Sequence, residues 1–229
     1  MKPRKLNVLL ACEYSGTFRR AFQALGCNAV SVDLDPSDDN SPDHFQQDIV
    51  AFLNATPTHY DLVMAFPPCT HLATSGAKHF PAKIKDGRQQ QAIDFFMYFV
   101  NLPRIAPKRF PLVVIENSVG VMSTKHRKPD HILQPYQFGD PHSKRTCFWV
   151  EQPQTPITVK PKLYPTHAPP YDKGEFYISP KTGKRMPAWY NMPESKDRGK
   201  KRSLAFPGMA AAVAHQLVQH MLYNPEIPL

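Results

Sequence analysis

The sequence contains no hydrophobic run that approaches the roughly 20 apolar residues a helix needs to span a bilayer. The apolar stretch nearest the N-terminus is short and meets Glu13, which is typical of a first strand and not of a secretory signal. The sequence also has no internal repeat and no low-complexity tract. We therefore expect a globular, cytoplasmic protein with no membrane partner.

The four cysteines, at positions 12, 27, 69 and 147, stand far apart and form no CxxC pair. Neither a disulfide framework nor a zinc site is indicated, so no metal is expected and a reducing compartment fits. A single cysteine is more often a small buried hydrophobic residue than a nucleophile. A reactive cysteine in this chain must therefore be identified from its surroundings.

Negative charge is in short supply, because 28 Lys and Arg face 19 Asp and Glu, and the net charge is +9 with a pI near 9.4. Residues 33–61 are the exception, because they carry seven aspartates and no Lys or Arg. Lys and Arg concentrate instead in four segments, 78–88, 104–109, 125–128 and 196–202. This pattern favours a polyanionic partner, nucleic acid first, with a solvated basic surface as the alternative.

The first half of the chain alternates between strand and helix patterns, which predicts a parallel sheet with crossover helices. Apolar runs predict strands at 6–11, 28–32, 60–65, 112–115 and 147–150, with a short strand and helix within 44–53. Helical spacing predicts helices at 17–25, 88–102 and 207–222. Residues 151–200, rich in Pro, Lys, Tyr and Gly, indicate loops with at most a hairpin. We therefore divide the chain into a catalytic core (1–150), a Pro/aromatic/basic insert (151–205) and a C-terminal helix that returns to the core (206–229).

Polar residues follow the predicted strands where each strand ends. In open parallel sheets ligands bind beyond these carboxyl ends, so we expect one site there. An acid that closes the second strand, here Asp33, suits a ribose diol, and the small-residue turn at Ser15-Gly16 suggests an adenosine-containing cofactor. No GxGxxG is present, so a dinucleotide fits poorly.

The polar residues at the strand ends follow one another in the same order as the motifs of the cytosine-5 DNA methyltransferases, which they resemble. The resemblance covers roughly residues 6–150 and the last helix, and its most specific parts are the Pro-Cys and Glu-Asn pairs at successive strand ends. The matching residues are Tyr14-Ser15-Gly16-Thr17-Phe18-Arg19, Asp33, Asp48, Phe66-Pro67-Pro68-Cys69-Thr70, Glu116-Asn117 and Ser143-Lys144-Arg145.

The resemblance implies a Rossmann-like S-adenosylmethionine-dependent methyltransferase fold, a mostly parallel α/β sheet with helices on both faces. It implies methyl transfer to cytosine C5 in DNA through a covalent bond from Cys69 to C6, which makes C5 nucleophilic. Glu116 would protonate the ring at N3, Asn117 would fix local backbone, and Arg145 would steady the adduct or orient the thiol. S-adenosylmethionine would be held by Tyr14, Ser15, Gly16, Asp33, Leu34, Asp48 and Pro67.

The resemblance also implies a mobile loop at residues 70–88 that closes over a flipped base, with Gly76 and Gly87 as pivots. Basic residues would contact the phosphates of DNA, most simply a duplex. We assign this contact to Lys78, Lys83, Lys85, Arg88, Lys184, Arg185, Lys200 and Lys201.

Three departures from the family leave the substrate open. The glycine-rich first motif is reduced, the second arginine of the Arg motif is replaced by Cys147, and only about residues 151–205 are available for target recognition. The same chemistry on single-stranded nucleic acid or a free cytosine nucleotide therefore stays an alternative. So does a methyltransferase-like nucleic-acid-binding subunit with impaired catalysis, and an additional protein subunit could supply recognition surface.

Overall fold

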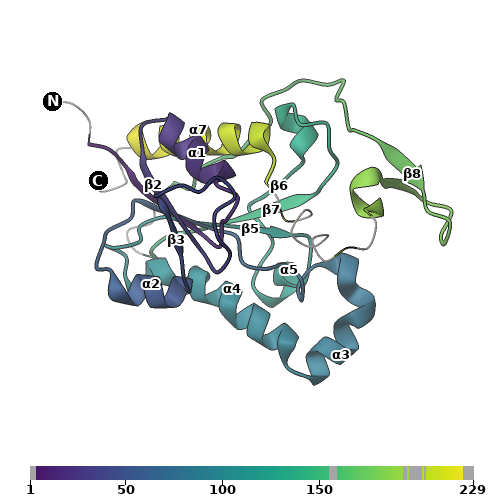
Figure 1. Cartoon of the computed structure of the whole chain (residues 1–229), viewed down its shortest axis with the longest axis horizontal. Coiled ribbons are helices and arrows are strands. Elements are labelled where there is room, and N and C mark those ends of the chain that lie inside the picture. The colour runs from purple at the N-terminus through teal and green to yellow at the C-terminus, as the bar shows by residue number, and fades with distance from the viewer. Residues whose placement is uncertain (1–3, 155–158, 193–194, 196–202, 204, 224–229) are drawn as a thin grey trace.

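A seven-stranded sheet forms the centre of the protein (Figure 1). The structure, a computed structural model, describes residues 4–154, 159–192, 195, 203 and 205–223. The strand order is β3-β2-β1-β4-β5-β7-β6; strands β1 to β5 are parallel, and β7 is antiparallel to both of its neighbours. The strands are β1 Asn7–Ala11, β2 Asn28–Asp33, β3 His44–Gln46, β4 Leu62–Ala65, β5 Val113–Ser118, β6 His131–Leu133 and β7 Thr146–Glu151.

Helices cover both faces of the sheet because the central strands are apolar on both sides. In β1, Val8 and Leu10 pack on one face with helices α1 (Thr17–Ala24) and α7 (Pro207–Tyr223). Leu9 packs on the other face with α2 (Ile49–Ala55) and α4 (Arg88–Ile105). Figure 1 shows the two helix layers above and below the sheet. Continuous apolar strands of this kind are typical of parallel sheets. The expected Rossmann-like α/β methyltransferase fold is confirmed.

The segment predicted as a loop between Cys69 and α4 is helical instead, so that prediction is wrong in its secondary structure. It forms a 3-10 helix η1 (Thr74–His79) and a short helix α3 (Phe80–Lys85). Pro81 lies in the first turn of α3, where a missing N–H costs no hydrogen bond. The Lys83 side chain turns inward, and its ammonium donates to the Thr70 carbonyl at 2.6 Å.

Two further elements differ from the sequence expectation. Strand β5 extends through Ser118, so Glu116 and Asn117 lie within the strand and not after it. The chain then forms a short helix α5 (Met122–Lys125), β6 and a 3-10 helix η2 (Pro135–Phe138), which sequence patterns did not predict. Elements of three or four residues are too short to carry a recognisable hydrophobic period.

The segment after β7 packs against the core before it forms the expected hairpin. Leu163 is buried among the side chains of α7, and the Gln216 amide exchanges two 3.0 Å hydrogen bonds with the backbone of Tyr164. The hairpin consists of β8 (Phe176–Ile178) and β9 (Arg185–Pro187), followed by a 3-10 helix η3 (Ala188–Asn191). The proposed division at residues 151 and 205 stays a prediction.

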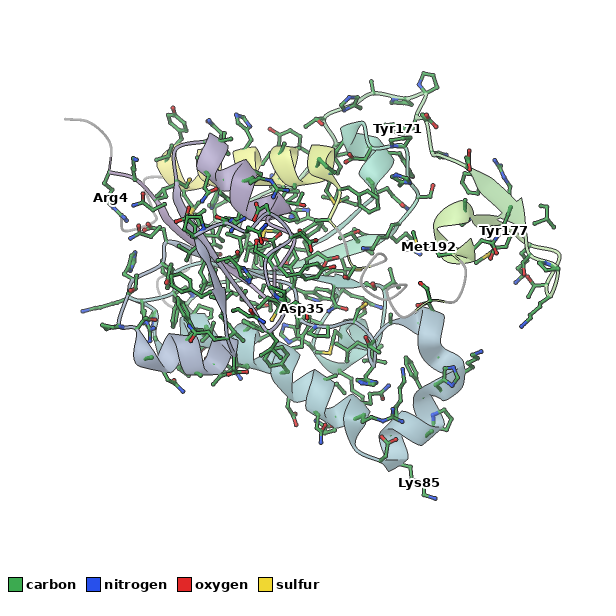
Figure 2. All side chains as sticks on the ribbon, in the orientation of Figure 1. Arg4, Asp35, Lys85, Tyr171, Tyr177 and Met192 are labelled. Atoms are coloured by element: carbon green, nitrogen blue, oxygen red, sulfur yellow. The ribbon has the colours of Figure 1, made fainter. Side chains whose placement is uncertain are left out.

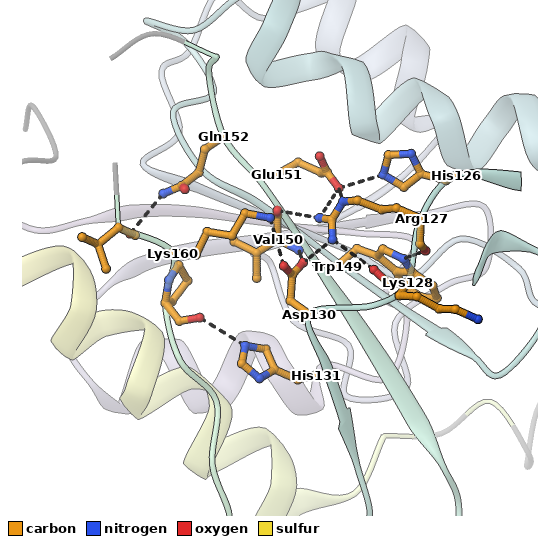
Figure 3. A network of polar contacts seen from close by, with 12 residues as sticks. His126, Arg127, Lys128, Asp130, His131, Trp149, Val150, Glu151, Gln152 and Lys160 are labelled. Carbon is orange, nitrogen blue, oxygen red and sulfur yellow. Dashed lines mark hydrogen bonds and ion pairs between the residues drawn. The ribbon is translucent and has the colours of Figure 1, made fainter. Parts of the chain in front are cut away.

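A cluster of ion pairs holds the amino-terminal edge of the parallel strands, where β7 ends (Figure 3). The buried Glu151 carboxylate lies 2.9 Å from His126 Nε2 and accepts a 2.6 Å hydrogen bond from Arg127. Asp130 pairs with Arg127 at 2.8 Å and with Lys160 at 2.9 Å. Acids at this edge are therefore matched by cations. Of the helices in the described residues, none has the length and apolarity to cross a membrane.

Candidate active site

A cavity of about 690 Å³ opens beyond the carboxyl ends of β1, β2, β4 and β5. Strand order reverses between β1 and β4, because β2 lies on one side of β1 while β4 and β5 lie on the other. This switch point is where ligands bind in open α/β sheets. The topology alone therefore makes this cavity the candidate binding site, and the residues around it indicate its chemistry.

Cys69 lines this cavity just after β4. It is a free, half-buried cysteine that follows Pro67 and Pro68, whose rings restrict the backbone before it. The Cys69 carbonyl accepts 2.9 Å hydrogen bonds from the N–H groups of Leu72 and Ala73, which closes a turn. The thiol is thus presented to the cavity by a constrained backbone.

The chain beyond Cys69 is tied to the extension of β5. Thr74 N–H donates to the Val119 carbonyl, and Val121 N–H donates to the Leu72 carbonyl, each at 3.0 Å. Gly120 lies between these bonds, where a Cβ atom would overlap the backbone of Leu72. Only glycine permits this close approach of the two segments.

Two neighbouring β5 residues have different positions in the site. Glu116 lines the cavity, and burial raises the pKa of its carboxyl above the usual range, while the ammonium of Lys144 opposes the rise. Asn117 is buried and does not line the cavity; its amide donates to the Pro67 carbonyl at 2.8 Å and accepts from Ser118 N–H at 2.9 Å. Asn117 therefore links β5 to the backbone that carries Cys69.

Arg145 lines the cavity and is exposed to solvent. The neighbouring Lys144 also lines it, and its ammonium lies 5.6 Å from the centre of the Phe206 ring. Cys147, which replaces the second arginine of the resembled motif, is fully buried in the core on the α4 face and cannot reach the cavity. Lys144 was not among the predicted site residues, although it stands inside the matched Ser143-Lys144-Arg145 motif.

The predicted cofactor residues Tyr14, Ser15, Asp33 and Pro67 line the same cavity. Burial raises the pKa of Asp33, whose carboxylate also accepts a 2.9 Å hydrogen bond from the N–H of Asp35. The Tyr14 hydroxyl lies 3.2 Å from Ser203 Oγ, so the turn after β1 meets the segment that leads to α7.

Three predicted cofactor residues lie outside the cavity lining. Gly16 precedes α1 with φ 69°, and a Cβ atom there would collide with the Arg19 side chain, so the turn requires glycine at this position. Leu34 is 71% exposed. Asp48 caps α2 through a 2.9 Å hydrogen bond from Ala51 N–H. The cofactor contacts assigned to these residues stay predictions.

Glu13 lines the cavity beside the predicted cofactor residues but was not among them. It is 5% exposed, lines the cavity, and accepts a 2.6 Å hydrogen bond from Ser15 Oγ at Oε1. Oε2 has no hydrogen-bond partner among the described residues. The available signal was its position, because an acid directly after the first buried strand points to the carboxyl edge of the sheet.

The predicted phosphate contacts around α3 divide into exposed and buried side chains. Lys78, Lys85 and Arg88 are exposed, and Arg88 pairs with Asp86 at 2.5 Å. Lys83 is 8% exposed and occupied by the Thr70 carbonyl, so it does not present its charge to a partner at the surface. Its contribution is to hold the chain after Cys69 against α3.

The second set of predicted phosphate contacts lies on the hairpin. Lys184 and Arg185 are exposed, and the Arg185 guanidinium stacks 4.1 Å from the centre of the Phe176 ring. Figure 2 shows that the hairpin, marked by Tyr177, and α3, marked by Lys85, form two separate projections. Lys200 and Lys201 lie outside the described residues. Among the described residues, no three His, Cys, Asp or Glu side chains are grouped to hold a metal ion.

The chain matches no protein-family model and no curated protein. It is similar, at 16% identity, to three solved structures. A prophage-encoded protein of E. coli named as a DNA modification methyltransferase has a TM-score of 0.46, and the match covers 64% of this chain and 46% of that one. For the S. pombe Dnmt2 methyltransferase the TM-score is 0.45 and the coverage is 68% of this chain and 52% of that one; for the Entamoeba histolytica methyltransferase EhMeth the TM-score is 0.44 and the coverage is 76% and 58%. The chain thus spans about half the length of these proteins. It has the α/β methyltransferase fold, and the order of its strand-end residues resembles the cytosine-5 DNA methyltransferase motifs.

Proposed function

We propose that the protein is an S-adenosylmethionine-dependent methyltransferase that acts on C5 of cytosine in DNA. One arrangement carries the proposal: Cys69 and Glu116 line the same cavity from adjacent parallel strands. The Asn117 amide fixes the backbone between them. A binding protein needs neither a thiol nor a buried acid at this edge, whereas covalent activation of a pyrimidine needs both.

The nucleophile in this scheme is the thiolate of Cys69, formed by loss of its proton to solvent. Its sulfur bonds to C6 of cytosine, the electron pair of the C5–C6 double bond forms a C4–C5 double bond, and the pair of the C4–N3 double bond moves to N3. Glu116, whose pKa is raised by burial, gives its proton to N3 and so stabilises the adduct. C5 becomes the nucleophilic carbon of an enamine.

Completion of the cycle restores each group. S-adenosylmethionine, when bound, supplies the methyl group that C5 accepts. Loss of the C5 proton to solvent then expels the Cys69 sulfur from C6 and re-forms the double bond, and N3 returns its proton to Glu116. The cationic side chains of Lys144 and Arg145 border the same cavity as Cys69.

The residues around β1 and β2 would hold the cofactor. Asp33 closes β2 in the position that suits a ribose diol, with Tyr14 and Ser15 on the turn after β1. The unpartnered Glu13 oxygen fits a ligand that carries a positive charge, as S-adenosylmethionine does. These residues bind and orient the cofactor, while those of β4 and β5 act on the base.

The test is methyl transfer from labelled S-adenosylmethionine to duplex DNA, single-stranded DNA and dCMP in parallel. Label in duplex cytosine supports the proposal, and label only in single strands or dCMP reassigns the substrate. Cys69→Ser abolishes transfer, whereas Cys27→Ala, whose side chain lies in the core on the α1 face, retains it.

A DNA duplex that carries 5-fluorocytosine supplies the second readout. The fluorine cannot leave C5 as a proton does, so the protein stays bonded to DNA, and mass spectrometry locates the bond at Cys69. Duplex binding without label transfer or adduct formation on any substrate refutes the enzymatic function.

A further inference from the structure

The cations of the cavity come from one short segment of the chain. Among the described residues, Lys144 and Arg145 are the only Lys or Arg side chains that line it. The carboxyl groups that line the same cavity are those of Glu13, Asp33, Asp35 and Glu116. A nucleic acid therefore gains electrostatic attraction in this cavity from two side chains, so the placement of the segment that carries them bears on substrate binding.

This cationic segment, residues 141–145, belongs to no helix or strand and is held by the insert. Ser143 Oγ donates to the Lys173 carbonyl at 2.9 Å. The next residue of the insert, Gly174, approaches Pro141 so closely that a Cβ atom on the glycine would overlap the Pro141 carbonyl oxygen. Gly174 also has φ 72°, so glycine is required both by the conformation and by the close approach.

Residues 171–175, which we call the stem, are themselves fixed by helix η2. The rings of Tyr171 and Tyr136 lie 5.1 Å apart, and the Lys173 ammonium lies 5.6 Å from the centre of the Tyr136 ring. The N–H of Tyr136 donates to the His142 carbonyl at 3.2 Å. Tyr136 thus contacts the stem on one side and the cationic segment on the other, so the three segments pack as one unit.

The stem also leads directly into the basic hairpin. Strand β8 begins at Phe176, immediately after the stem, and the hairpin carries the exposed Lys184 and Arg185. The part of the insert predicted to contact phosphates is therefore continuous with the part that holds the cations of the cavity.

We infer that Ser143 and Gly174 are positioning residues that hold Lys144 and Arg145 in place for the nucleic-acid substrate, an inference that rests on the proposed function. Ser143 directly precedes the two cations, and Gly174 packs on the residue that begins their segment. Loss of either contact frees this backbone, and ordering it again when the substrate binds costs conformational entropy. The insert thereby contributes to substrate binding inside the cavity as well as at its own surface.

The test is a double-mutant cycle in equilibrium binding of a fluorescein-labelled DNA duplex, with a single strand in parallel, at one low salt concentration. Ser143→Ala binds about 3- to 10-fold more weakly than wild type, the range expected for one hydrogen bond. In a background that carries Lys144→Ala and Arg145→Ala, the same change alters the affinity by less than about 2-fold, because its effect passes through these cations.

Gly174→Ala is the second variant, and Gly26→Ala is its matched control. Gly26 also has a left-handed backbone, with φ 82°, but no atom of the described residues lies within 4 Å of an added Cβ. Both variants bear the backbone strain, and only Gly174→Ala displaces Pro141. Gly174→Ala therefore weakens duplex binding by at least about 3-fold in the wild-type background alone, while Gly26→Ala binds as wild type does.

Equal weakening by Ser143→Ala with and without the two cations overturns the positioning role, because the hydroxyl then acts elsewhere. Wild-type affinity in both Ser143→Ala and Gly174→Ala overturns it too, as does equal loss in the two glycine variants. Failure of wild-type protein to bind either nucleic acid refutes the proposed function itself. Binding without methyl transfer refutes the enzymatic function and leaves the cycle readable, so the two failures are distinguished.

Discussion

Replacing Asn117 with alanine tests whether the link between β5 and the Cys69 backbone controls reactivity. The amide makes two hydrogen bonds, to the Pro67 carbonyl at 2.8 Å and from Ser118 N–H at 2.9 Å, at a site only 2% exposed. Each bond contributes about 0.5–1.5 kcal/mol, and the partners left behind are also desolvated, so the total loss is about 2–3 kcal/mol. For a chain of this size that lowers the Tm by roughly 4–12 °C.

The functional effect of Asn117→Ala is separable from this loss of stability. Pro67 lies two residues before Cys69, and a shift of about 1 Å in a reacting group can cost roughly 100-fold in rate. We expect kcat to fall by about that factor, and the rate of thiol alkylation at Cys69 to change with it, well below the Tm.

The matched control is Gln216→Ala. This amide is also buried and also makes two backbone hydrogen bonds, both to Tyr164, but it lies on α7. A similar drop in Tm with unchanged kcat and alkylation rate is expected. If both variants lose activity equally, or if Asn117→Ala keeps full activity, the positioning role of Asn117 is refuted.

Two further predictions concern the same edge of the sheet. Burial raises the pKa of the Glu116 carboxyl, so the folded protein holds its carboxyl proton at pH values where the unfolded chain has lost it. The free energy of unfolding therefore falls as the pH rises from the ordinary carboxyl pKa through the raised one. Thermal scans of Glu116→Gln should therefore show a Tm advantage over wild type that grows between pH 4 and pH 8; a constant difference contradicts the assignment. Gly120→Ala, whose Cβ would overlap the Leu72 backbone, should lose at least about 1–3 kcal/mol in chemical denaturation. Gly76→Ala is the control and should lose no stability, because the nearest atom to its added Cβ would be Lys83 Nζ at 3.5 Å. Equal losses of stability in the two variants would refute the close approach at Gly120.

The sequence sufficed for the sheet and for the meeting of Cys69 with Glu116. Continuous apolar runs specify buried parallel strands, and the carboxyl ends of such strands meet at one edge, so residues 47 positions apart come together without any knowledge of loops. The acid that closes β2, Asp33, was located by the same reasoning. Helices α1, α4 and α7 were predicted because each carries a long apolar stripe.

The rest depended on contacts that no local pattern records. Lys83 was read as a phosphate contact because it is basic, but a carbonyl 13 residues away draws it inward and orders the segment after Cys69 as helix. Asp48 was predicted to contact the cofactor, which stays a prediction, while its role as the cap of α2 was not predicted. Glu13 and Lys144 were in view in the sequence, yet only the cavity shows that both face the site.

Asp130, at the amino-terminal edge of the sheet, differs from three acids that line the cavity at the carboxyl edge, and this contrast bears on where function resides. At the amino-terminal edge, the Val150 N–H, Lys160 and Arg127 together hold the pKa of Asp130 below its usual range against the opposing effect of burial. At the carboxyl edge, burial raises the pKa of Glu13, Asp33 and Glu116. A chain with a net charge of +9 has cations available, yet the effect of burial outweighs that of the nearby cations, Arg19 at Glu13 and Lys144 at Glu116. Acids whose pKa is raised beside a cavity are candidates to meet a ligand or take part in a reaction, which supports the proposal that function resides at this edge.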